Sequence, residues 1–182
     1  MPMPQVSWEI ATLATPSDIT SAIASTTAAA SWPIGTVDAD AQPKALTTFL
    51  VWNNKGTSAA PTVGVSDMQD CSITVVDANH GNTGAGNCLE ILRDQWVRVQ
   101  CLSASETAMT PVGSLAPATI NAGAHPIKAT GVTGNVIEGA GNVGDFATNT
   151  TNYARVAAEL VIPNTASAGA VNGYIRIAFK YV

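Results

Sequence analysis

The chain has 182 residues, which is enough for a single domain with a sizeable buried core. Hydrophobic residues make up 46% of it and charged residues 12%, a balance that argues against a disordered chain. The formal net charge is -5, and the 8 Lys and Arg residues are scattered singly, which argues against nucleic-acid binding.

Short neutral side chains, mainly Ala, Thr, Ser, Asn and Gly, take the place of the missing charges. They predict either a surface of small neutral groups or one that neighbouring subunits largely cover. No basic segment followed by an apolar one opens the chain, and no apolar run reaches the roughly 20 residues of a membrane helix. We therefore expect a protein that is made in the cytosol, is not secreted and inserts into no membrane.

The N-terminal region is predicted to be a strand followed by an arm. Residues 6–13 alternate loosely between apolar and polar, as a first strand would. Residues 14–31 are rich in Ala, Ser and Thr, and they fit either a short helix capped by Ser17 or Asp18 or an extended arm. We therefore expect residues 1–35 to form an extended N-terminal arm and residues 36–182 a separate domain.

Three further strands are expected in the middle of the chain. Residues 45–52, 71–77 and 95–102 are rich in β-branched and aromatic residues and are bounded by turn formers. Residues 80–87 are a loop by their Gly and Asn content. A weaker strand is expected at residues 126–132, after a stretch of loop or weak strand at residues 103–125.

The C-terminal region carries the clearest strand pattern. One face of the expected strand carries Ile175, Ile177, Phe179 and Tyr181, and the opposite face carries Arg176, Ala178 and Lys180. A second alternating run covers residues 155–162, and a loop of turn formers separates the two. The pattern predicts a β-hairpin that closes the chain.

Short strands between Gly-, Pro- and Asn-rich stretches, with no long helix, predict an all-β fold. We expect an antiparallel β-sandwich or jelly roll over residues 36–182, with the extended N-terminal arm attached to it.

The residues that could carry catalysis form no recognisable constellation. His80 and His125 each lie in a loop of small residues, which is typical of exposed histidines. Cys71, Cys88 and Cys101 with His80 match no zinc-binding spacing. We therefore expect no enzyme, no catalytic residues, no metal and no cofactor. A disulfide between subunits through Cys88, in the Gly-rich loop, is the remaining hypothesis for the cysteines.

The four tryptophans divide into two pairs. Trp52 and Trp96 lie in expected strands and are predicted to fill the core, although a sugar-stacking surface formed by all four tryptophans is the alternative. Trp8 and Trp32 lie on either side of the low-complexity stretch. We interpret these two as partner-binding residues that anchor the arm to its own domain or to a neighbouring subunit.

Five segments of the chain resemble small β-sandwich virion structural proteins of tailed bacteriophages. They are residues 49–56, 67–75, 95–99, 152–156 and 161–169. The resemblance consists of strand and turn patterns, so it carries over no active-site residue.

The resemblance implies a protein of the virion, synthesised in the host cytoplasm. Its partners would be the major capsid protein or other virion proteins, and it would form a homo-oligomer, with a trimer as one expected form. The expected function is that of a non-enzymatic capsid decoration (cement) protein that stabilises neighbouring capsid subunits. The alternative is a tail-fibre or tail-tip recognition module that binds a host surface glycan.

Overall fold

The computed structural model describes residues 1–115 and 123–182, and nearly all its regular structure is β. The elements, in chain order, are β1 (Val6–Leu13), β2 (Ile23–Ala28), β3 (Pro43–Asn53), β4 (Gln69–Asp77), α1 (Leu89–Arg93), β5 (Val97–Cys101), the 3-10 turn η1 (Leu102–Ala104), β6 (Thr110–Val112), β7 (His125–Pro126), η2 (Thr150–Asn152), β8 (Tyr153–Val161) and β9 (Gly173–Lys180).

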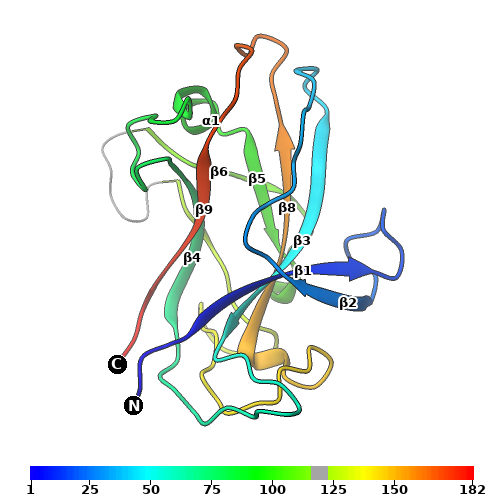
Figure 1. Cartoon of the computed structure of the whole chain (residues 1–182), viewed down its shortest axis with the longest axis vertical. Coiled ribbons are helices and arrows are strands. Elements are labelled where there is room, and N and C mark those ends of the chain that lie inside the picture. Colours follow the sequence, from blue (N-terminus) through cyan, green and yellow to red (C-terminus); the bar gives the residue numbers. More distant parts are fainter. Residues whose placement is uncertain (116–122) are drawn as a thin grey trace.

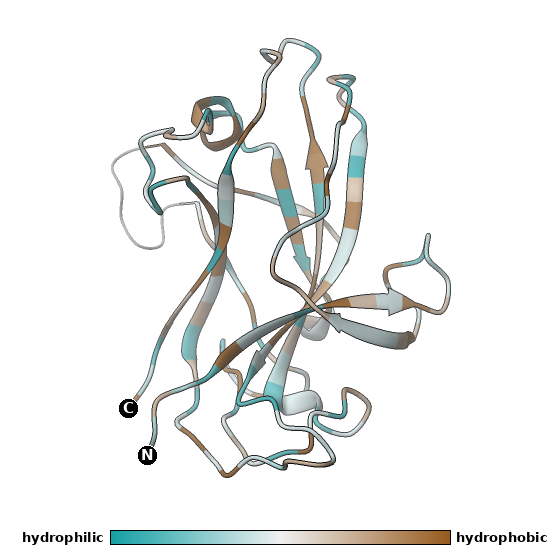
Figure 2. Cartoon of the chain, viewed as in Figure 1, coloured by the Kyte–Doolittle hydropathy of each residue, from teal (hydrophilic) through white to brown (hydrophobic). Residues whose placement is uncertain are grey.

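Two antiparallel sheets face each other (Figure 1). The larger has six strands in the order β2-β1-β3-β8-β5-β6, and the smaller has three in the order β7-β4-β9. The predicted all-β antiparallel sandwich is therefore confirmed. Brown and teal bands alternate along strands such as β5 in the hydropathy colouring (Figure 2).

The core lies between the sheets and follows the period-two alternation of the strands. Val51 on β3, Val156 on β8 and Val99 on β5 point inward from the larger sheet, and Ile73 on β4 meets them from the smaller one. All four side chains are fully buried, and each contributes roughly 1.5–3 kcal/mol to folding. The strands predicted at residues 6–13, 45–52, 71–77 and 95–102 are present as β1, β3, β4 and β5.

The predicted C-terminal hairpin is wrong. β8 pairs with β3 and β5 in the larger sheet, whereas β9 pairs with β4 in the smaller one. The loop between β8 and β9 crosses from one sheet to the other. The two sheets of a sandwich are about 10 Å apart. Alternation identified the buried face of β9, because Ile175, Ile177 and Phe179 pack against the core. It was wrong for Tyr181, which lies beyond the end of β9 and is exposed. Alternation also does not specify the neighbouring strand.

The extended N-terminal arm is not confirmed. β1 pairs with β3 from Val6 to Ala11, and β2 pairs with β1, so residues 6–28 form a hairpin within the larger sheet. The Ala/Ser/Thr-rich stretch is thus extended and partly strand rather than helical. The weak strand expected at residues 126–132 is reduced to β7, and residues 116–122 of the stretch at 103–125 lie outside the described residues.

Candidate functional site

A groove of about 1080 Å³ opens between the two sheets. It lies where the connection between β2 and β3 (residues 29–42) and the connection between β8 and β9 pass along one side of the sandwich. Its walls are mainly apolar and include Val75 on β4, Val97 on β5 and Leu160 on β8. Grooves of this size and composition are typical of binding sites for small molecules or peptide segments.

Three aromatic rings form one part of the groove, which we call the aromatic box: Trp8, Trp32 and Phe49. The register of β1 on β3 pairs Trp8 with Val51, so Trp8 lies diagonal to Phe49 on the inner face. The Phe49 ring centroid is 6.0 Å from that of Trp8 and 5.9 Å from that of Trp32. Both indole planes stand nearly perpendicular to the Phe49 ring, at 85° and 86°.

The rings of the aromatic box are held in place by their surroundings. Phe49 is only 3% exposed, whereas both tryptophans are half-buried and reach the groove surface. The Trp32 indole N–H donates to the Ala45 carbonyl oxygen at 3.2 Å and to Thr47 Oγ1 at 3.0 Å. The structure therefore brings together the two predicted partner-binding tryptophans, and it adds Phe49, which the strand pattern marks only as a core residue.

The other groove residues set its polarity. Trp96, which is 5% exposed, lines it, and its indole N–H has no hydrogen-bond partner among the described residues. Asp38 carries the only charge among the described residues that line the groove, and its side chain is exposed. The site thus combines aromatic surface with one carboxylate.

Trp52 and Trp96 are buried, which confirms their predicted place in the core. Trp52 belongs to a second cluster on the outer face of the larger sheet, together with Leu50 and Tyr153. Its indole N–H donates to a Glu9 carboxylate oxygen at 2.9 Å, and Lys55 pairs with the same carboxylate.

The structure argues against a disulfide between subunits through Cys88. The side chain is completely buried, and its thiol donates to the Asn172 carbonyl oxygen at 3.1 Å. Burial raises the pKa of Cys88, and it raises the pKa of Cys71 to about 12, so both remain protonated thiols. Cys101 is also buried and packs as a small hydrophobic residue.

The Gly-rich loop at residues 80–87 surrounds a buried carboxylate, that of Asp77. The backbone N–H groups of Asn79, Gly81 and Thr83 and the Thr83 hydroxyl donate to it at 2.8–2.9 Å. Burial by itself raises the pKa of Asp77, but these hydrogen bonds outweigh it and hold the pKa well below its usual range. The loop is therefore built around an internal anion.

Neither histidine is among the described residues that line the groove, and the two rings contact different residues. His80 is exposed and stacks on Tyr174, with ring centroids 4.3 Å apart. The prediction of an exposed loop residue is wrong for His125. Its side chain is only 12% exposed, and its Nε2 lies 2.9 Å from the Glu106 carboxylate. The His125 ring thus faces a carboxylate, and the His80 ring faces an aromatic side chain.

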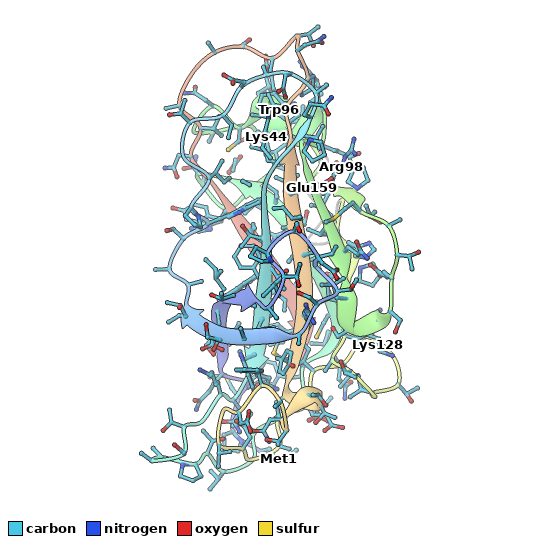
Figure 3. All side chains as sticks on the ribbon, turned by 90° about the vertical axis from the view of Figure 1, so that its right-hand side faces the viewer. Met1, Lys44, Trp96, Arg98, Lys128 and Glu159 are labelled. Carbon is cyan, nitrogen blue, oxygen red and sulfur yellow. The ribbon has the colours of Figure 1, made fainter. Side chains whose placement is uncertain are left out.

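The second distinctive surface is the hairpin tip, which we define as residues 14–22 between β1 and β2. The hairpin stands out from the larger sheet in Figure 1 and crosses in front of β3 and β8 in Figure 3, below Arg98 and Glu159. Arg155 on β8 donates from Nη2 to the Ile19 and Ser21 carbonyl oxygens at 2.6 and 2.7 Å. Asp18 accepts from Thr20, which lowers the pKa of Asp18. The tip is therefore ordered while it remains exposed.

Within residues 1–115 and 123–182, no three His, Cys, Asp or Glu side chains lie together as metal ligands would. None of the helices in the same residues is long and apolar enough to span a bilayer. Comparisons with protein families, with curated proteins and with solved structures find no match to the chain.

Proposed function

We propose that the chain is a non-enzymatic structural protein of a bacteriophage virion, a capsid decoration protein that stabilises neighbouring capsid subunits. The resemblance of its strand and turn segments to such proteins supports the proposal, as does its low charge content of 12%. The observation that carries it is the ordered, exposed hairpin tip, whose residues are mostly small and neutral and whose backbone is held by Arg155.

The hairpin tip suits a contact across a subunit seam for a thermodynamic reason. Its backbone is already ordered in the free protein, so little further conformational entropy is lost when it binds a shell. The desolvation free energy of neutral side chains such as Ala14 and Thr15 is smaller than that of charged side chains. Many copies on one shell then add small individual gains, at roughly 25 cal/mol for each apolar Å² that is buried.

The experiment replaces residues 14–22 by a two-residue Asn-Gly turn, which keeps β1 and β2 paired. Removing residues 1–35 altogether is unsuitable, because it would take two strands from the larger sheet. We expect the variant to fold, as circular dichroism would show, and to lose co-sedimentation with particles. Shortening the exposed loop at residues 57–60 is the matched control and should leave attachment intact. Full attachment of the hairpin-tip variant would contradict the assignment.

The partners that follow are the major capsid protein or other virion proteins, and a second or third copy of the chain itself. A contact of Trp8 and Trp32 with such a partner stays a prediction. Both side chains reach the groove surface, so a partner segment has access to them.

The second candidate is a tail-tip module that binds a host glycan, and one observation favours it. Tyr174 is 43% exposed at the rim of the groove, and its ring is stacked on His80. Fixed, exposed aromatic faces are suited to stacking on sugar rings. A glycan array separates the candidates: specific binding that Tyr174→Ala abolishes supports the recognition module, whereas a decoration protein shows none.

A further inference from the structure

The outer edge of β2 differs from the other sheet edges among the described residues. The end strands of the two sheets are β2, β6, β7 and β9. The strands β6 and β7 are very short and contain Pro111 and Pro126, and β9 carries Arg176 and Lys180. Short length, proline and charged side chains are the usual protection of an edge against further strand pairing. The strand β2, Ile23–Ala28, is longer than β6 or β7 and contains neither a proline nor a charged residue.

The pairing of β2 with β1 determines which backbone groups face outward. The Ala29 N–H donates to the Trp8 carbonyl oxygen at 2.9 Å, and the pairing from there back to Ser25 is regular. In an antiparallel pair, alternate residues direct their N–H and C=O groups to opposite sides. Those of Thr26 and Ala28 therefore face away from β1. Within residues 1–115 and 123–182, no backbone hydrogen bond joins either residue to an element beyond the sheet.

The surroundings leave this edge accessible and uncharged. Ser25, Thr27 and Ala28 are exposed, and the hairpin of β1 and β2 stands out from the rest of the larger sheet (Figure 1). No charged residue occurs in the sequence between Asp18 and Asp38. Two copies of this edge can therefore meet without placing like charges opposite each other, although each chain carries a net charge of -5.

The edge is also self-complementary. Its outward groups recur at every second residue, so an antiparallel copy brings each N–H of one strand opposite a C=O of the other. Its side chains are short and neutral, so the edge has no charge with which to select a charged partner strand. A second copy of the same strand is therefore the partner that fits it best.

We propose that β2 pairs antiparallel with β2 of a second copy of this chain, across a two-fold axis at Thr27, which joins the two larger sheets into one. Thr26 of one copy then faces Ala28 of the other, and each such pair exchanges backbone hydrogen bonds. The two Thr27 residues face each other in a pair without backbone hydrogen bonds, with their Cα atoms about 4.5 Å apart. A contact of this symmetry closes at two copies and leaves neither β2 edge unpaired.

This pairing deepens the proposed virion role, because it names the surface through which copies meet. Its test uses the isolated protein, so a failure of the pairing and a failure of the virion role are distinguishable. One strand pair buries less than the roughly 1,200 Å² of a stable interface, so association should be reversible and concentration-dependent.

Sedimentation equilibrium of the unmodified protein over a range of concentrations is the first measurement. We expect a reversible equilibrium between monomer and dimer. A protein that remains monomeric up to about 1 mM, the weak limit of specific association, would overturn the proposal.

Two variants locate the contact on β2. Thr26→Pro removes an outward N–H and leaves the hydrogen bonds to β1 in place, and Thr27→Lys places two ammonium groups across the axis. Each variant, checked for folding by circular dichroism, should weaken dimerisation by about tenfold or more. Thr133→Lys, at an exposed loop position, is the matched control and should leave it unchanged. A dimer that survives both β2 substitutions would place the contact elsewhere and overturn the proposal.

A charge exchange tests the register of the pairing. Thr27→Lys and Thr27→Glu should each be largely monomeric, whereas a mixture of the two should form a mixed dimer, because opposite charges then face each other across the axis. This recovery cannot come from a folding defect in either variant. No recovery in the mixture would contradict an axis at Thr27.

Residue-resolved amide hydrogen exchange separates a second copy from another partner. In the dimer, the outward N–H groups of Thr26 and Ala28 should exchange more slowly than in the dilute monomer, whereas those of Ser25 and Thr27 should be protected in both. Protection of Thr26 and Ala28 only when particles are added would assign the edge to a strand of a shell protein and overturn the self-pairing.

Discussion

Asp77 shows how a single residue can organise a loop that carries many glycines. Its buried carboxylate accepts hydrogen bonds from the backbone of residues 79–85, and these hold its pKa well below the usual range. Asn in its place keeps the shape but loses the charge and one acceptor oxygen. We expect Asp77→Asn to lower the free energy of unfolding by about 2–4 kcal/mol, measured by urea denaturation.

The lowered pKa of Asp77 also predicts how the unfolding free energy falls at acid pH. A carboxyl whose pKa is lowered on folding stabilises the protein above its unfolded pKa of about 3.9, and that contribution is lost as the pH falls below this value. Unfolding free energies at a series of pH values should therefore fall below about pH 4 in the unmodified protein. The decline should be shallower in Asp77→Asn but not in Asp145→Asn, an exposed turn residue. Identical pH profiles for all three proteins would contradict this role.

The cysteines give a second prediction at this scale. Burial raises the pKa of Cys71 to about 12 and also raises that of Cys88, so neither offers a thiolate at neutral pH. A thiol-specific chromogenic disulfide reagent should leave all three buried thiols of the folded protein unmodified and react with all of them in urea. A covalent dimer on a non-reducing gel of freshly purified protein would restore the intersubunit disulfide.

At the scale of elements, Arg155 ties the hairpin tip to the larger sheet. The two carbonyl oxygens of Ile19 and Ser21 lose their donor in Arg155→Met, which keeps the apolar stem of the side chain. We expect residues 14–22 to become sensitive to limited proteolysis, with a loss of about 1–2 kcal/mol in unfolding free energy. Arg93→Met removes only an exposed pair with Asp94 and should change neither. A protease-resistant tip in Arg155→Met would show that the clamp is dispensable.

The elements also show what a single sequence can predict. Alternation located β3, β4 and β5 because each has one face against the core, and it placed Ile175 and Ile177 on the buried face of β9. It could not predict that β8 and β9 belong to different sheets, since period-two patterning is the same for any antiparallel neighbour. For the same reason, β1 was expected in an arm although it pairs with β3.

The sequence could not predict the groove, for a related reason. Trp8 and Trp32 were interpreted as partner-binding anchors of the arm, but their position around Phe49 depends on the register of β1 on β3 and on the path of the β2–β3 connection. Neither is encoded in a local pattern. Nothing in the sequence distinguished Phe49 from its neighbours Leu50 and Val51 in the same strand.

At the scale of the whole molecule, the chain is a sandwich of unequal sheets, with an ordered hairpin on one outer face and an aromatic groove along one side. Few charges cover it, so large areas can be buried against neighbours at little desolvation cost. This combination suits repeated attachment to a regular shell.

The copy number of the chain in purified particles, measured by quantitative mass spectrometry against the major capsid protein, tests that account most directly. A decoration protein should be present in a fixed ratio to the capsid protein, because equivalent positions on a symmetric shell offer equivalent contacts. Absence from the particles, or only a few copies in each, would contradict it.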